Sequence, residues 1–216
     1  MSARVEVAAG LAVVELVALV AVGAAASYQA PLRVPAGSAI TYFIAEGTKP
    51  TGFRATDREL ARWALEDWQR SAARGLRFES AAESSALVRV YWAEPNSGEY
   101  GEMRPFMLGD RRGAAVFIRP DMESLGEAIA QRAAADPLLR ETIVYLTCLH
   151  ELGHALGLEH TRDFRDIMYF FGYGGDIVQF FGRYRAQLRS RSDIAAVSGL
   201  SDADVRRLKA LYPTGP

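Results

Sequence analysis

The sequence is poor in residues that cross-link chains or bind metals: it has one cysteine, Cys148, and three histidines among 216 residues. A single cysteine excludes an intramolecular disulfide and a four-cysteine zinc cluster. The net charge is −1, whereas nucleic-acid-binding domains usually carry a basic excess, so no nucleic-acid partner is expected. Stability must therefore come from a hydrophobic core, which a domain of about 180 residues can supply.

Long apolar runs are lacking except near the N-terminus, where residues 8–26 are apolar apart from Glu15. Arg4 precedes this run and three alanines, residues 24–26, end it, an arrangement typical of a secretory signal peptide. Glu15 is unusual there, because a charge inside such a segment costs insertion energy. We interpret residues 1–27 as a cleaved signal peptide or an uncleaved membrane anchor; the remaining alternative is a buried soluble helix.

The rest of the chain predicts an α+β domain. Runs rich in β-branched and aromatic residues, bounded by turn residues, are typical of strands. A glycine-rich polar connection is expected between Asn96 and Gly113. The predicted strands are Ile40–Ile44, Leu76–Ser80, Leu87–Trp92 and Ala114–Ile118.

Helices are predicted from their start signals and the spacing of apolar residues. Thr56 and Glu59 have the spacing of a capping box. Asp121 is expected to cap a second helix, and Asp136 before Pro137 is a favourable start for a third, long one. The predicted helices cover residues 57–73, 121–135, 136–157 and 201–212.

All three histidines lie on or just after the long predicted helix. His150 and His154 are four residues apart, so they project from one face and can ligate the same ion. Glu151 lies about 100° further around the helix. From there it can reach a metal-bound water without binding the metal itself.

A catalytic zinc ion usually takes three protein ligands, so a third must come from elsewhere. Gly157 can end the helix in the left-handed conformation and return the chain so that His160 joins the other two. The pattern His-Glu-x-x-His-x-x-Gly-x-x-His is complete and predicts one catalytic zinc ion held by His150, His154 and His160. The alternatives are three ordinary structural histidines, or a degenerate site that binds zinc without hydrolysis.

This stretch resembles the active-site helix and Met-turn of the metzincin metallopeptidases, most closely their matrixin branch. Thr161 follows the third histidine and Met168 lies at the matrixin spacing, while Leu200–Tyr212 is similar to the closing helix. The likeness covers about residues 33–213. It implies a catalytic domain with a twisted, mostly parallel sheet of four to five strands, an active-site helix, a Met-turn and a C-terminal helix. It also implies that Met168 forms the hydrophobic base under the zinc.

The sequence also departs from the matrixin pattern. About a dozen residues separate residue 26 from the first strand, which leaves no room for the cysteine-bearing propeptide of vertebrate matrixins. No histidines remain for a structural zinc, and calcium ligands are not evident. Cys148 is interpreted as a small core residue. Phe170 stands where matrixins usually have proline.

The motif and the resemblance together imply a zinc-dependent endopeptidase acting on protein or peptide substrates. Glu151 would serve as general base toward a metal-activated water and pass the proton to the leaving amine. The alternative is a non-catalytic, zinc-containing binding protein that uses the same cleft. The N-terminal segment implies a secreted or extracytoplasmic protein, or one anchored in a membrane with its catalytic domain outside.

The segment between Met168 and Leu200 is rich in aromatic residues. By resemblance it shapes the pocket for the residue after the scissile bond. One interpretation is an apolar pocket wall that favours a bulky hydrophobic side chain there. A second is that the rings pack a small lower subdomain. A third is that Asp176–Leu188 forms a basic amphipathic surface for a membrane.

Overall fold

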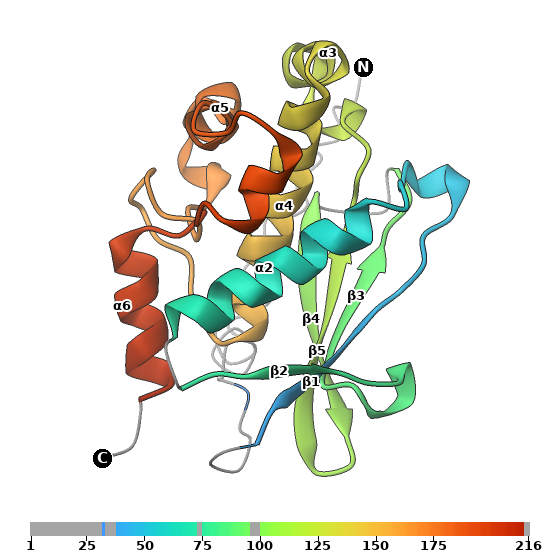
Figure 1. The fold of residues 1–216 in the computed structure, drawn as a ribbon, viewed down its shortest axis with the longest axis vertical. Coiled ribbons are helices and arrows are strands. Elements are labelled where there is room, and N and C mark those ends of the chain that lie inside the picture. The colour runs from blue at the N-terminus through green and yellow to red at the C-terminus, as the bar shows by residue number, and fades with distance from the viewer. Residues whose placement is uncertain (1–31, 33–37, 73–74, 96–99, 214–216) are drawn as a thin grey trace, which may run out of the picture.

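A computed structural model of the chain describes residues 32, 38–72, 75–95 and 100–213. Its strands are β1 (Ile40–Ile44), β2 (Phe78–Ser80), β3 (Val88–Trp92), β4 (Gly101–Leu108) and β5 (Arg111–Ile118). They form one sheet in the order β2-β1-β3-β5-β4 (Figure 1). β4 is antiparallel to β5, and the other neighbouring pairs are parallel. The predicted α+β class with a mostly parallel sheet is confirmed.

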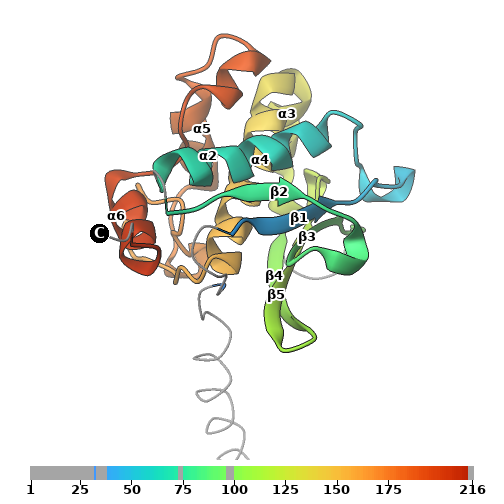
Figure 2. The same ribbon diagram turned by 60° about the horizontal axis from the view of Figure 1, so that its bottom comes forward.

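The helices are α2 (Asp57–Ser71), α3 (Glu127–Ala135), α4 (Pro137–Ala155), α5 (Ile177–Arg185) and α6 (Asp202–Leu211). α2 and α4 cover one face of the sheet, and α5 packs against α4 (Figures 1 and 2). In β3, Val88, Val90 and Trp92 are buried while the residues between them are half-buried. This alternation places the core between the sheet and the two covering helices.

Most of the region expected to be a polar connection, residues 96–113, belongs to the sheet. β4 and the first residues of β5 lie within it, while residues 96–99 lie outside the described ranges. The prediction was wrong because β4 is an edge strand of untypical composition. Glu102 and Arg104 form an ion pair on it, and Pro105 lacks a backbone N–H. Charged residues and proline are unfavourable in a central strand but tolerated at an edge.

The predicted capping box at the start of α2 is also wrong. Thr56 already has helical backbone angles, and its side chain makes no capping hydrogen bond. The carboxylate of Asp57 instead accepts from the backbone N–H of Arg54 at 2.8 Å and from the guanidinium of Arg140 on α4 at 2.8 Å. Both members of this ion pair are buried, so it joins the beginnings of α2 and α4 in the core.

The second predicted helix is shorter than expected. A single 3-10 turn, Glu123–Leu125, comes first, and α3 begins only at Glu127. Gly126 between them has a φ of +100°, which interrupts the helix. The carboxylate of Asp121 accepts from the backbone N–H groups of Glu123 and Ser124 in this short turn and does not begin a long helix.

The predicted signal peptide or anchor, residues 1–27, lies outside the described residues. Across the ranges that the structure describes, no helix combines the length and apolar character that crossing a bilayer requires. Leu32 is buried, and its backbone N–H donates to the hydroxyl of Tyr212 at 3.1 Å. That hydroxyl donates in turn to the carbonyl of Leu156 at 3.0 Å, so the entering chain is held beside the end of α4.

Candidate metal centre and active site

α4, which carries the histidine motif, is fixed at its start and along its length. The carboxylate of Asp136 accepts from two backbone N–H groups of the first turn, as the sequence predicted. The indole of Trp68 on α2 donates to the carbonyl of Leu149 at 2.9 Å. Cys148 is fully buried, which confirms it as a core residue, and burial raises the pKa of its thiol well above the usual value. The motif therefore lies on a rigidly held helix.

Gly157 lies in the turn that reverses the chain after α4. Its φ is +96°, a conformation that side-chain-bearing residues rarely adopt. The N–H of Leu158 donates to the carbonyl of Gly153 at 2.9 Å, and the N–H of Gly157 donates to that of His154 at 3.0 Å. These are the two hydrogen bonds of a Schellman motif. The reversal brings His160 back to the face of the helix that carries the other two histidines.

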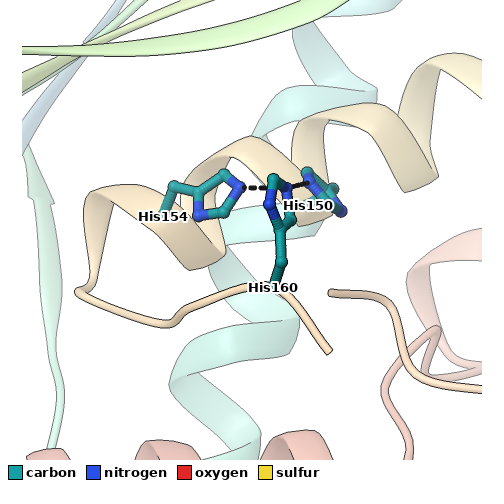
Figure 3. Close-up of side chains that lie close together, drawn as sticks. All are labelled: His150, His154 and His160. Carbon is teal, nitrogen blue, oxygen red and sulfur yellow. Dashed lines mark hydrogen bonds between the residues drawn. The ribbon is translucent and has the colours of Figure 1, made fainter. Parts of the chain in front are cut away.

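Figure 3 shows the three imidazoles directed toward one another. The Nε2 atom of His160 lies 3.3 Å from Nε2 of His150 and 3.0 Å from Nε2 of His154. One potential ligand atom from each ring lies within 4.8 Å of the others. Elsewhere in the described residues, no group of three or more His, Cys, Asp or Glu side chains converges in this way.

The other ring nitrogens of the two helix histidines are held by backbone carbonyls. Nδ1 of His150 lies 2.7 Å from the carbonyl of Ile167, and Nδ1 of His154 lies 2.9 Å from that of Leu158. A carbonyl can only accept, so each Nδ1 carries the proton and Nε2 keeps its lone pair. Burial lowers the pKa of His150 to about 3 and that of His154 to about 4, and lowers that of His160. Three neutral imidazoles with converging Nε2 atoms fit a catalytic zinc ion.

The side chain of Glu151, on α4, faces the edge strand β4. It is 6% exposed. A Cβ atom added to Gly101 would lie 2.6 Å from the Oε1 atom of Glu151 and 2.8 Å from a methyl carbon of Thr147. Position 101 therefore has no room for a side chain, because the strand passes directly against the carboxylate. Glu151, Gly101 and the three histidines line the same cleft.

Met168 is fully buried against α4. A Cβ atom added to Gly153 on that helix would lie only 2.4 Å from the sulfur of Met168. The preceding residue, Ile167, is tied to the C-terminal helix: its N–H donates to the carboxylate of Asp204 at 2.8 Å. The segment that supplies the carbonyl to His150 is thus fixed by both α4 and α6.

The cleft has a volume of about 650 Å³, and its wall beyond the histidines is apolar. Phe180 and Phe181 are buried, and their rings pack against each other and against Phe171. The same rings therefore pack in the core and line the cleft, while a preference for a bulky hydrophobic substrate side chain stays a prediction. The apolar wall includes Leu146, Ile167, Tyr169, Phe170, Phe171, Ile177, Phe180 and Phe181.

The third interpretation, a membrane-facing surface over residues 176–188, does not match the packing of α5. Phe181 on α5 and Leu188 just after the helix, both on the predicted apolar side, are buried in the core. Arg185 pairs with Asp136 at 2.7 Å, and Arg183 donates to the carbonyl of a neighbouring loop. The hydrophobic side of α5 faces the protein because it completes the packing on α4.

Some residues that shape the site were not identified from the sequence. Gly101 has no local signal, because the approach of Glu151 arises only when β4 packs beside α4. Asp204 could be recognised as the third residue of a capping box that begins at Ser201, a role it fills. Its second contact, to Ile167, joins residues 37 positions apart and has no sequence signature.

Comparison with known protein families agrees with this geometry. The matrixin family model matches residues 35–179, a span that holds the whole sheet, α4 and the three histidines. α6 lies beyond the matched residues. The match covers well over half of the chain. The chain therefore belongs to the matrixins, a family of zinc-dependent metallopeptidases.

Proposed function

We propose that this metallopeptidase is an endopeptidase in which His150, His154 and His160 hold the zinc ion and Glu151 is the general base. The observation that carries the proposal is the position of the Glu151 carboxylate, buried in the same cleft as three converging Nε2 atoms. Zinc bound there would lower the pKa of a water molecule to about 7 and polarise the substrate carbonyl. Glu151 takes a proton from the attacking water and returns it to the leaving amine.

The substrate backbone is proposed to lie along β4. This strand is the last in the sheet, and among the described residues no strand pairs with its outer edge. An extended peptide can add to such an edge through main-chain hydrogen bonds. Gly101 on this strand is in contact with the Glu151 carboxylate, so a peptide held there passes the general base.

A bulky hydrophobic side chain is the expected preference after the scissile bond. The cleft offers about 650 Å³ next to the histidines, and its wall is built from apolar and aromatic side chains. Burial of an apolar side chain contributes about 25 cal/mol per Å² removed from water. Met168, packed against Gly153, forms the base beneath the histidines in this proposal.

Substitution of Glu151 by glutamine tests the assignment of the general base. The variant should retain zinc, measured by elemental analysis, while kcat/KM for a peptide library falls by a factor of roughly 10² to 10⁴. Glu159→Gln is the matched control, because Glu159 is exposed beside His160 and should leave turnover unchanged. Retained hydrolysis by Glu151→Gln would reject the assignment. Zinc binding without chelator-sensitive cleavage in the wild type would favour the non-catalytic binding protein.

We propose further that residues 1–27 direct the protein out of the cytoplasm, so that the enzyme is secreted or extracytoplasmic. N-terminal sequencing of protein purified from the producing cell tests this. A mature chain that begins near Ser27 supports cleavage, whereas an intact segment that fractionates with membranes supports the anchored alternative. An intact chain in the soluble cytoplasmic fraction contradicts both.

A further inference from the structure

The three histidines differ in what holds their rings in place. His150 and His154 each have one nitrogen hydrogen-bonded to a backbone carbonyl. His160 lies on the returning loop, and among the described residues its Nδ1 atom has no hydrogen-bond partner. Its ring instead stacks on that of Phe170, with centroids 4.7 Å apart and planes inclined by 21°. The third imidazole is therefore oriented by an aromatic contact.

Phe170 is itself held by a glycine-rich loop. Its ring lies over Gly172, where an added Cβ atom would come within 2.1 Å of the ring carbon Cε1. The rings of Tyr173 and Phe170 form a T-shaped pair, with centroids 5.4 Å apart and planes inclined by 88°. The guanidinium of Arg162 lies 4.5 Å from the centre of Tyr173. Four side chains thus form one continuous arrangement, the His160 stack: His160, Phe170, Tyr173 and Arg162.

Exposure sets this stack apart from the packed core. Phe170 is 42% exposed and Tyr173 is 48% exposed. Among the described residues they are two of only three large hydrophobic side chains with such exposure, the third being Met107 at 64%. Each of the two residues keeps more than two fifths of its surface exposed, so it buries less apolar surface than an aromatic residue of the core does. Phe170 contacts His160, and Tyr173 contacts Phe170, which gives the two rings a different role.

We propose that Phe170 is a positioning residue for His160, whose imidazole it holds in the plane that directs Nε2 toward the other two histidines. The Phe170 ring orients His160 as the backbone carbonyls orient His150 and His154. Histidines that bind a metal usually have such a supporting contact. A proline, the residue that matrixins usually have here, has no aromatic face and cannot supply this contact. The proposal rests on the assignment of the three histidines as the zinc ligands.

The expected effect follows from the size of one aromatic contact. Loss of an aromatic pair corresponds to a change in binding of roughly 3- to 10-fold. Phe170→Leu keeps apolar bulk but removes the aromatic face, so it should weaken zinc binding by about that factor. Phe170→Tyr keeps the ring and should bind zinc at least as tightly as the wild type. Met107→Leu, at the other exposed hydrophobic site, is the control and should leave zinc binding unchanged.

The test is a zinc competition assay with a chromogenic chelator on the full chain carrying Glu151→Gln, which prevents self-digestion. The absorption spectrum of the Co²⁺-substituted protein gives a second readout, because it reports ligand geometry directly. The proposal is supported if Phe170→Leu binds zinc more weakly and has an altered Co²⁺ spectrum, while Phe170→Tyr matches the wild type in both. The circular dichroism spectra of both variants should match that of the wild type, which shows that they are folded. Equal zinc affinity and equal Co²⁺ spectra for the leucine and tyrosine variants would overturn the proposal.

A further variant separates this proposal from the assignment of the metal site. His160→Ala should weaken zinc binding far more than any change at Phe170. If His160→Ala binds zinc as tightly as the wild type, the histidine is not a ligand and both the site assignment and the stack proposal fail. If His160→Ala loses zinc while Phe170→Leu does not, the metal site stands and only the positioning role of Phe170 is rejected.

Discussion

Replacing Asp204 by alanine tests whether α6 holds the metal-binding segment in place. The carboxylate of Asp204 is fully buried and accepts from the backbone N–H of Ile167 at 2.8 Å and of Ser201 at 2.9 Å. It also accepts from the guanidinium of Arg207 at 2.7 Å. The carbonyl of Ile167 in turn accepts from Nδ1 of His150. One side chain on α6 thus fixes the residue that orients a predicted zinc ligand.

The loss of stability in Asp204→Ala follows from these contacts. Alanine leaves two backbone N–H groups without their acceptor, and each unsatisfied buried donor costs roughly 1–3 kcal/mol. Arg207 is partly exposed and keeps its contact with Asp166, so the loss of its ion pair with Asp204 adds little. The free energy of unfolding should fall by about 2–6 kcal/mol, the sum for two such donors. Zinc affinity should fall by a factor of roughly 10 to 100, because His150 loses its oriented carbonyl.

Urea unfolding of the zinc-free protein measures the first quantity, and competition with a chelator measures the second. Asp202→Ala is the matched control, because Asp202 lies in the same first turn of α6 but is exposed. Its effect on stability should stay below about 1 kcal/mol, the typical size of a helix-dipole contribution. Equal stabilities of the Asp204 and Asp202 variants would refute the reasoning, as would undiminished zinc affinity in a folded Asp204→Ala protein.

The remaining predictions concern the helix that bears the motif. Gly157→Ala places a side chain at a φ of +96° and should cost roughly 1–2 kcal/mol in thermal or urea unfolding, whereas an unchanged melting temperature would show that the turn adapts freely. Gly153→Ala puts a methyl group 2.4 Å from the sulfur of Met168 and should destabilise the protein by about 1–3 kcal/mol, with wild-type stability as the contrary result. Folded-state pKa values of about 3 for His150 and about 4 for His154 lie below the ordinary value of 6.5, so the unfolded chain binds more protons in acid. Zinc-free protein should therefore lose stability as pH falls from about 6.5 toward 4, in urea titrations at several pH values, and His154→Gln should flatten that dependence.

The parts of the fold that sequence predicted well are those with strong local signals. β1 and β3 are short runs of β-branched and aromatic residues, and α4 begins at an Asp-Pro pair and ends at a glycine. Each of these signals acts within a few residues, so the neighbouring chain decides the structure. The histidine motif is of the same kind, because its spacing on one helix and one turn already implies convergence.

The parts that escaped prediction depend on contacts between distant residues. β4 became a strand because β5 offers a partner along its whole length, although Glu102, Arg104 and Pro105 resemble a loop. Thr56 does not cap α2 as predicted, because Asp57 forms an ion pair with Arg140, 83 residues away, at the start of the helix. At the site, the support given by Asp204 and the approach of Gly101 to Glu151 both arise from packing. Such contacts leave no periodic or spaced pattern in the sequence.

The link between Asp204 and Ile167 also bears on the order in which the enzyme is made. Synthesis proceeds from the N-terminus, so the residues of the sheet, α4 and the histidine loop are made before those of α6. Until then Ile167 lacks the acceptor that fixes it, and His150 lacks a firmly held carbonyl. A chain truncated before Asp204 would therefore carry every residue of the histidine motif but lack the contact that fixes Ile167 beside His150.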